Sequence, residues 1–354
     1  MAGGVGSRFW PVSRTSHPKQ FIDILGTGCT LLQQTYNRFL LFCPKENIFV
    51  VAHESYRELV MQQLPELDES NILLEPARKN TAACIAYAVW KIASKNPDAV
   101  MVAAPSDHLI TKVNTFVKAI KSCFKKAESQ DCLLTLGIKP TRPDTGYGYI
   151  QYTDSGKKEK DPRIKKVKTF TEKPDLEMAK FFLQSGDFLW NSGIFIWSVK
   201  SIMKAFRDFE PEMAHLFSEG KSKYWTNAEP AAVAQIYSNC KNISIDYSIM
   251  EKAKNVYVRA SLIGWSDLGT WGSLYKHLQT DEQGNAVIGK NAMLYNSKNC
   301  IVNVSKDKIA VIEGLEDYIV VESDNIILIC KKEDEQQIRN FVNYVKTTKG
   351  EKYI

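Results

Sequence analysis

Residues 2 to 21 read AGGVGSRFWPVSRTSHPKQF, and the interpretation of the whole chain starts from this stretch. Three of the four residues from 3 to 6 are glycines, which let a ligand approach the backbone and permit the positive φ angles of a tight anion-binding loop. Arg8, Arg14 and Lys19 follow, so backbone N–H donors and mobile cations gather in one place. The stretch therefore predicts a loop, not a helix, that binds a polyphosphate.

Two better-known phosphate loops do not match this stretch. The pattern G-x-x-x-x-G-K-[ST] is absent from it, and Phe9 stands where the dinucleotide fingerprint needs its third glycine. The glycines alone would also suit an ordinary surface turn. A buried strand normally precedes such a loop, yet only Met1 stands before Ala2, so we expect either an apolar strand upstream or another segment in its place.

Composition limits the kind of protein. The 354 residues, with 44% hydrophobic and 24% charged side chains, suit a globular catalytic domain of about 250 residues with a smaller appendage. The net charge of +6 is mild, and acidic residues interrupt the lysine-rich stretch 157–168, so we expect small anionic substrates and no nucleic acid. Eight cysteines without a C-x-x-C pair indicate reduced core thiols. Because neither a signal peptide nor an 18-residue apolar run occurs, we expect a cytoplasmic protein that does not enter a membrane.

The order of predicted elements indicates an α/β fold. Apolar strands alternate with helices as far as residue 137, which predicts a Rossmann-like fold with a mixed, mostly parallel sheet between helices. Ligands of such sheets lie beyond the carboxyl ends of the strands, so we expect the glycine loop and the segments 75–80 and 105–108 on one rim. From about residue 284 the chain turns to short β-rich pieces and a final polar helix. We predict a domain over 1–280 and a small β-rich domain over 281–354.

Two aspartates and several cations could carry chemistry on this rim. Asp107 follows an apolar strand and Asp267 lies in a Trp-rich turn, and two carboxylates suffice for Mg²⁺ when phosphate and water complete its shell. Either aspartate alone could equally cap a turn. With Arg8, Lys19 and Lys173 they could compensate the charge of phosphoryl transfer, for which an anionic sugar phosphate needs no general base.

The chain resembles the sugar-1-phosphate nucleotidyltransferase family, and within it the mannose-1-phosphate guanylyltransferases. The resemblance rests on the loop of residues 2–21 and on further strings in the family's order. These strings are EPARKNTA at 75–82, PSDH at 105–108, TGYGYI at 145–150, EKP at 172–174, NSGIF at 191–195, SIDYSIMEK at 244–252 and WSDLGTW at 265–271.

The resemblance implies the transfer of GMP from GTP to α-D-mannose 1-phosphate with Mg²⁺, by a homodimer with a left-handed β-helix-like C-terminal domain. Because few residues follow residue 280, we expect no isomerase domain of the kind that some relatives carry. It implies metal held by Asp107 and Asp267, and a sugar-phosphate contact from Lys173. The implied nucleotide contacts are Ala2, Gly3, Gly4, Gly6, Ser7, Arg8, Glu75, Lys79, Asn80 and Thr81. The implied sugar contacts are Gly148, Glu172, Asn191 and Asp246.

One departure and two alternatives accompany this reading. Lys79 stands where the family has an arginine before Asn-Thr-Ala, and lysine does not replace a bidentate arginine, so the base preference is less fixed than the reaction. The alternatives are a nucleotidyltransferase for another sugar or base, and a non-catalytic subunit that binds nucleotide sugars. A joint set of five residues argues against the second alternative, namely Arg8, Lys19, Asp107, Lys173 and Asp267.

Overall fold

The computed structural model describes residues 1–153 and 160–354, which form two compact units. The first unit contains Met1–Gly3, Arg38–Pro105 and Ile110–Trp265. The second contains Gly4–Asn37, Ser106–Leu109 and Ser266–Ile354. The second unit thus collects the glycine loop, the Asp107 segment and the C-terminal part of the chain. The domain boundary near residue 280 stays a prediction.

The main sheet of the first unit has six strands in the order β3-β8-β5-β9-β7-β6. Among these described strands only β5 and β9 pair in parallel, so the sheet is mixed, as predicted, but the expectation that it is mostly parallel is wrong. Periodicity shows where strands lie but not which neighbours they take, and the long β8 pairs antiparallel with β3, β5 and β6. A separate parallel pair joins β1 and β2. The bounds are Val50–His53 (β1), Ile72–Glu75 (β2), Val100–Ala103 (β3), Leu133–Ile138 (β5), Gly148–Thr153 (β6), Ile164–Glu172 (β7), Phe188–Ser198 (β8) and Val256–Ala260 (β9).

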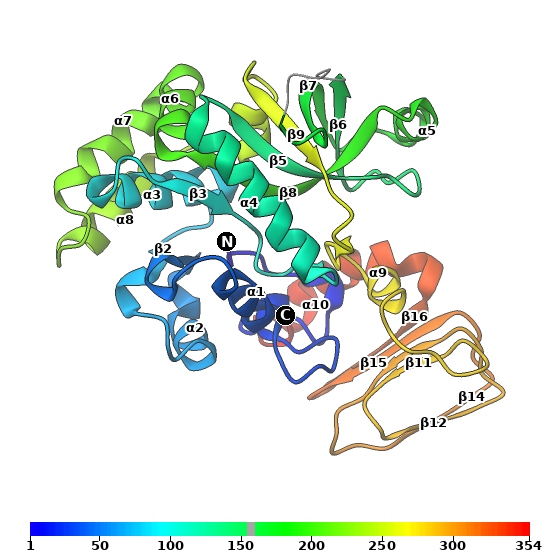
Figure 1. The fold of residues 1–354 in the computed structure, drawn as a ribbon. Coiled ribbons are helices and arrows are strands. Elements are labelled where there is room, and N and C mark those ends of the chain that lie inside the picture. The colour runs from blue at the N-terminus through cyan, green and yellow to red at the C-terminus, as the bar shows by residue number, and fades with distance from the viewer. Residues whose placement is uncertain (154–159) are drawn as a thin grey trace. The chain divides into compact units, whose positions relative to one another are not determined.

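Helices cover both faces of this sheet, as expected for the α/β class (Figure 1). Leu133 and Phe195 pack on the side of α3, whereas Leu134 and Ile196 pack on the side of α4. Successive strand residues point to opposite faces, so an unbroken apolar run is buried on both. The helices of this unit are Arg57–Gln63 (α2), Asn80–Lys95 (α3), Val113–Ser129 (α4), Leu176–Ser185 (α5), Val199–Phe209 (α6), Pro211–Glu219 (α7) and Glu229–Asn239 (α8).

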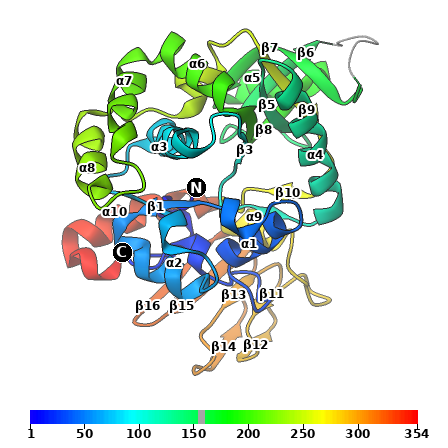
Figure 2. The same ribbon diagram turned by 60° about the vertical axis from the view of Figure 1, so that its left-hand side comes forward.

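Short parallel strands stack in the C-terminal part of the second unit, which confirms the expected β-rich domain (Figure 2). Its interior is lined by small and branched side chains such as Cys300, Val302 and Val320. The strands are Ala286–Ile288 (β11), Ala292–Tyr295 (β12), Ile301–Asn303 (β13), Ala310–Glu313 (β14), Tyr318–Ser323 (β15) and Ile326–Lys331 (β16). The helical elements of this unit are Ser7–Phe9 (η1), Lys19–Phe21 (η2), Trp271–Tyr275 (α9), Lys332–Gln337 (η9), Ile338–Lys349 (α10) and Glu351–Tyr353 (η10). The helix Leu31–Leu40 (α1) runs from the second unit into the first, and Leu109–Ile110 (β4) pairs with Trp265–Ser266 (β10).

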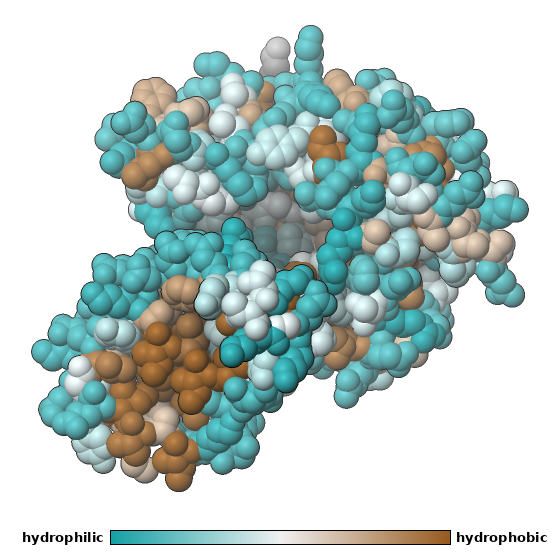
Figure 3. Space-filling model, turned by 180° about the vertical axis from the view of Figure 1, so that it is seen from behind, coloured by the Kyte–Doolittle hydropathy of each residue, from teal (hydrophilic) through white to brown (hydrophobic). Residues whose placement is uncertain are grey.

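Apolar side chains gather on the surface of the β-rich part (Figure 3). The large exposed ones there are Met293, Tyr295, Ile309, Val311, Ile327 and Ile329. All eight cysteines are free, and six of them are buried, as expected for reduced core thiols. No helix in the described ranges has both the length and the apolar character needed to span a bilayer.

Candidate active site

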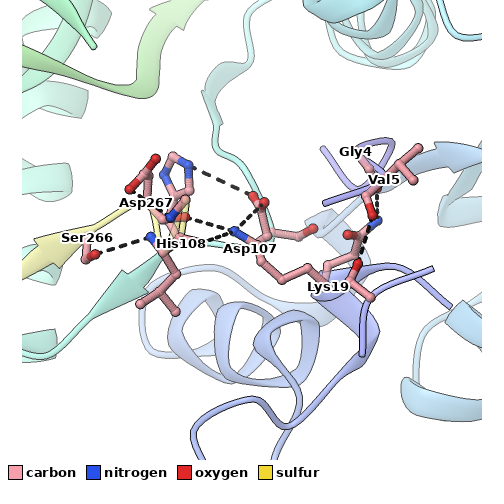
Figure 4. Close-up of polar contacts among 12 residues, drawn as sticks. Gly4, Val5, Lys19, Asp107, His108, Ser266 and Asp267 are labelled. Atoms are coloured by element: carbon pink, nitrogen blue, oxygen red, sulfur yellow. Dashed lines mark hydrogen bonds and ion pairs between the residues drawn. The ribbon is translucent and has the colours of Figure 1, made fainter. Parts of the chain in front are cut away.

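The ammonium of Lys19 joins three distant parts of the second unit (Figure 4). Lys19 begins η2 and is buried. Its Nζ lies 3.0 Å from Oδ2 of Asp107, and it donates to the carbonyl oxygens of Asp267 and Leu268 at 2.8 and 3.0 Å. The three predicted residues Lys19, Asp107 and Asp267 therefore meet in the folded chain.

Asp107 presents a partly exposed carboxylate. Its side chain is 30% exposed, and Oδ1 lies 3.9 Å from Nε2 of His108. Burial alone would raise the pKa of Asp107, but the charges of Lys19 and His108 and the hydrogen bond from Lys19 outweigh it and hold the pKa below its usual value. The carboxyl is accordingly ionised at neutral pH.

The Asp267 turn has a strained backbone. Leu268 has a φ of 44° although it is not glycine, and its side chain is fully buried. The N–H of Leu268 donates to Ser266 Oγ, and the N–H of Gly269 donates to Asp267 Oδ1 at 3.0 Å. Positive φ at a branched residue persists only where the surroundings enforce it, and such residues are frequent at functional sites.

The glycine loop has the features of an anion cradle. In the described part of the chain, the backbone N–H groups of residues 4–8 make no hydrogen bond. The carbonyls of Gly4 and Val5 instead accept hydrogen bonds from Gln20 and Ser13, both at 2.9 Å. Gly6 has a φ of 65°, and a Cβ there would lie 2.7 Å from Lys19 Cβ. Consecutive free N–H groups favour a phosphate as their partner.

The two aspartates fit a magnesium ion by their chemistry. Mg²⁺ prefers carboxylate oxygens and keeps positions for phosphate and water. The described residues contain no group of three or more His, Cys, Asp and Glu side chains that could hold a metal. A metal between Asp107 and Asp267 would therefore take its other ligands from substrate and solvent.

The predicted nucleotide segment lies at the end of β2 in the first unit. Glu75 is buried and accepts a hydrogen bond from the hydroxyl of Tyr237 at 2.9 Å. Burial raises the pKa of Glu75 to about 7. A Cβ at Gly3 would lie 3.3 Å from Glu75 Oε2, so Gly3 and Glu75 adjoin as predicted.

The start of α3 follows directly. Lys79 precedes the helix, and Asn80, with a φ of 65°, accepts the N–H of Thr81 on its side chain at 2.8 Å. Arg78, the nearest arginine to the family position, donates to the hydroxyl of Tyr56 at 2.6 Å and lies over its ring. Arg78 is thus held by Tyr56 in this structure, which leaves Lys79 as the cation at the family position.

The predicted sugar residues also gather in the first unit. Gly148 pairs with Glu172 across β6 and β7, and a Cβ at Gly148 would lie only 2.2 Å from Glu172 Oε2. Asn191 donates from Nδ2 to Asp246 Oδ1 at 2.8 Å. Burial, and next the charge of Glu172, raise the pKa of Asp246 to about 6. Oε2 of Glu172 is buried without a hydrogen-bond partner in the described residues, so this cluster has acceptor capacity for hydroxyl groups.

Lys173 follows Glu172 and lies beside it. Its Nζ is 2.5 Å from Glu172 Oε1, and the backbone φ is 51°. Burial alone would lower the pKa of Lys173, but the hydrogen bond and charge of Glu172 outweigh it and raise the pKa. Lys173 is thus a charged ammonium at the exit of β7.

Thr135 belongs to this cluster, although the sequence analysis did not select it. Its hydroxyl lies 3.1 Å from Asn191 Oδ1, which also accepts the N–H of Gly193 at 3.1 Å. These contacts fix the amide so that Nδ2 faces Asp246. The only signal in the sequence was a single polar residue within the apolar run Leu133–Leu136, and the structure shows that this residue is fully buried.

The nucleotide segment and the sugar cluster are connected within the first unit. The backbone N–H of Ile245, next to Asp246, donates to Thr81 Oγ1 at 2.9 Å. The backbone N–H of Ala82 donates to the carbonyl of Ile243 at 3.2 Å. The predicted residues thus form two groups, one in each unit. The loop residues Gly4, Gly6, Ser7 and Arg8 share the second unit with Lys19, Asp107 and Asp267.

Two family models match consecutive parts of the chain. The family model described as nucleotidyl transferase matches residues 1–284. A second model, described as a MannoseP isomerase/GMP-like β-helix domain, matches residues 290–344.

Three similar proteins cover almost the whole chain. The mannose-1-phosphate guanylyltransferase of Escherichia coli is 33% identical over 98% of this chain and 74% of its own length. The protein of the same name from Klebsiella pneumoniae is 34% identical over 100% of this chain and 74% of its own length. A crystal structure described as mannose-1-phosphate geranyltransferase from Thermus thermophilus has a TM-score of 0.84 and 27% identity, and covers 98% of each chain.

Proposed function

The chain belongs to the nucleotidyl transferase family, and from this premise we propose that it transfers GMP from GTP to α-D-mannose 1-phosphate, which yields GDP-mannose and pyrophosphate. The name shared by the curated relatives supports mannose 1-phosphate as the acceptor and a guanine nucleotide as the donor.

The observation that carries the proposal is the meeting of Asp107 and the Asp267 turn at Lys19, on the same unit as the glycine loop. A nucleoside triphosphate needs N–H donors for its phosphate groups and carboxylates for the Mg²⁺ ion that accompanies it. The second unit offers both, with five consecutive free N–H groups among its described residues.

In the proposed reaction, a phosphate oxygen of mannose 1-phosphate attacks the α-phosphorus of GTP. The bond from this phosphorus to the bridging oxygen breaks, and pyrophosphate leaves with that electron pair. The loop amides and Arg8 hold the triphosphate, and Lys173 with the Glu172, Asn191 and Asp246 cluster orients the sugar phosphate. Mg²⁺, held by Asp107 and Asp267, would offset the negative charge where the two anions approach.

A pyrophosphate-release assay tests the proposal. The protein is mixed with mannose 1-phosphate or glucose 1-phosphate, with ATP, CTP, GTP, UTP or dTTP, and with Mg²⁺. We expect the fastest release with GTP and mannose 1-phosphate, and none when EDTA removes the metal. Because Lys79 replaces the family's arginine, the comparison of the five nucleotides is the part of the assay that decides the base. Release with UTP or dTTP but not GTP would overturn the base assignment, and no release with any pair would overturn the reaction.

The variant Asp107→Asn tests the metal role. We expect at least about a 100-fold loss of turnover with little change in the fold, since asparagine keeps the shape of the side chain. Asp324→Asn is a matched control, because Asp324 is also paired with a cation of the N-terminal stretch, Arg14, at 3.3 Å. Turnover of the Asp107 variant equal to that of the control would remove the metal role.

Two properties of the whole protein belong to the same proposal. The exposed apolar side chains of the β-rich part support a homodimer. Free cysteines throughout the chain support a reducing compartment, for which we propose the cytoplasm.

A further inference from the structure

The C-terminal helix α10 packs directly on the phosphate loop within the second unit. Ile338 and Val342 of α10 are buried in one apolar cluster with Phe9 and Trp10, which follow the glycines. Trp10 also donates from Nε1 to the carbonyl oxygen of Tyr353 at 2.7 Å. In both ribbon views the red C-terminal helix lies beside the blue N-terminal stretch (Figures 1 and 2). The C-terminal helix and the residues after it therefore help to shape the loop.

This packing brings a second arginine to the loop. Arg339 directly follows the buried Ile338 and is itself exposed. Burial first, and then the positive charge of Arg8, lower the pKa of Arg339, in keeping with the packing of α10 on the residues that follow the glycines. Arg8 in turn reaches the Asp267 turn, because a Cβ at Gly269 would lie 3.3 Å from Arg8 Nη1 and 2.4 Å from Asp267 Oδ2.

Neither arginine has a counter-ion in the described residues. Arg8 and Arg339 make no hydrogen bond and no ion pair there, so the N–H donors of both guanidinium groups are available to a ligand. An anion bound between two guanidinium groups would replace repulsion with charge-assisted hydrogen bonds. Such an anion needs several oxygens and more than one negative charge.

We propose that Arg339 of the C-terminal helix, together with Arg8, binds the β- and γ-phosphates of the nucleotide, which leave as pyrophosphate. This inference rests on the proposed function. The terminal phosphates carry most of the charge of the triphosphate, and a planar guanidinium offers a pair of donors that matches phosphate oxygens. The β-rich part would then belong to the active site through its last helix, and not only to an interface.

Pyrophosphate binding tests the inference without turnover. Isothermal titration calorimetry measures the dissociation constant of inorganic pyrophosphate in the presence of Mg²⁺. The proteins compared are the wild type, Arg339→Ala, Arg339→Lys and Lys349→Ala. Lys349 is the control, because it is an exposed cation of the same helix without a partner in the described residues. We expect about a tenfold or larger loss of affinity for Arg339→Ala, a smaller loss for Arg339→Lys and no change for Lys349→Ala. Equal affinity of the Arg339→Ala and Lys349→Ala variants would overturn the inference.

A double-mutant cycle with Arg8→Ala sharpens the test. If both arginines bind one anion, the losses from Arg8→Ala and Arg339→Ala will not add. Thermal melting checks the fold, and we expect a midpoint for Arg339→Ala that is not below that of the wild type, since its side chain has no partner to lose and its removal ends the repulsion by Arg8. In turnover assays the KM for GTP should rise while the KM for mannose 1-phosphate stays constant. If the wild type turns over GTP and mannose 1-phosphate but Arg339→Ala binds pyrophosphate as tightly as the wild type, only the inference is contradicted. If the wild type binds pyrophosphate and Arg339→Ala weakens this binding, but no turnover occurs, only the proposed function is contradicted.

Discussion

Lys19 has three N–H donors on its ammonium, and oxygens of the protein lie within reach of all three. To contact a phosphate as well, the ammonium must exchange one of these acceptors. Its first role in the structure is therefore to hold Asp107 and the Asp267 turn in place. The position of Lys19 in the sequence predicts a phosphate ligand, and this role stays a prediction.

Arg14, the neighbouring cation of the same stretch, shows the limit of sequence reasoning about single charges. From its position it could be a surface charge or a phosphate ligand. In the structure its side chain is 13% exposed, pairs with Asp324 and donates to the carbonyl of Ser323 at 2.9 Å. Both partners lie more than 300 residues away in the chain, so no local pattern could reveal them.

Asp246 gives a pH-dependent prediction at the residue scale. Its pKa is raised from 3.8 to about 6, so the folded protein binds the proton more tightly than the unfolded chain. The stabilisation from the protonated form is therefore complete below about pH 4 and is lost as the pH rises through about 6. We predict that Asp246→Asn is more stable than the wild type by about 1–3 kcal/mol at about pH 8, with little difference at about pH 4.5. Urea unfolding at both pH values measures this.

The control for this prediction is Asp208→Asn, which removes one exposed carboxylate from α6. Its stability relative to the wild type should not depend on pH in the same way. A gain for Asp246→Asn that is equal at the acidic and the alkaline pH would show that the carboxyl titrates normally.

At the scale of elements, two glycines of the same loop have different roles, since Gly6 is required by the backbone and Gly4 is open to a ligand. Gly6 has a positive φ, and a Cβ added to it would lie only 2.7 Å from Lys19 Cβ. Gly4 has neither constraint, since a Cβ there would meet no atom within 4 Å in the described residues. Gly4 is therefore open on the side where a ligand could approach the backbone.

These two glycines predict opposite outcomes for the same substitution. Gly6→Ala should lower the free energy of unfolding by about 1–3 kcal/mol through strain and crowding. Gly4→Ala should leave the melting temperature unchanged but raise the KM for GTP about tenfold or more, because the new methyl group displaces the triphosphate. Melting curves and steady-state kinetics measure both effects. An unchanged KM in Gly4→Ala would show that no phosphate lies against this glycine.

The elements themselves were predictable where the apolar pattern is local. Up to residue 137 helices and strands alternate as predicted, as in α1 (Leu31–Leu40), β1, α2 and β2 (Ile72–Glu75). Strand directions were not predictable, because β8 chooses its partners through contacts that are distant in sequence. The left-handed backbone at Asn80, Lys173 and Leu268 also escaped prediction, since none of these residues favours it as glycine does.

The candidate site was predictable as a set of residues but not as a geometry. Motif order selected Asp107 and Asp267, yet only the folded chain shows that Lys19 joins them. Thr135 carried a weak signal as one polar residue in an apolar strand. Arg339 carried no signal in the sequence, because its proposed role depends on Arg8, which lies at the other end of the chain.

At the scale of the molecule, the β-rich part leaves several large apolar side chains exposed on its surface. Met293 and Val311 face solvent on adjacent strands, at 51% and 67% exposure, and they are direct neighbours in the register of β12 and β14. Exposed apolar side chains in contact with one another mark an interaction surface more often than single ones do. A second copy of the chain could cover this face with the same residues, as a two-fold interface requires.

The homodimer can be tested on this pair of side chains. We predict that the wild type sediments as a dimer at micromolar concentration and that Met293→Lys with Val311→Lys sediments as a monomer, because two buried ammonium groups per subunit would oppose association. Sedimentation velocity measures the mass, and thermal melting checks that each variant is folded. Leu262→Lys is the control, since Leu262 is 71% exposed in the first unit, outside the β-rich part, and should leave the dimer intact. A monomeric wild type would refute the dimer, and a doubly substituted variant that remains dimeric would place the interface on another face.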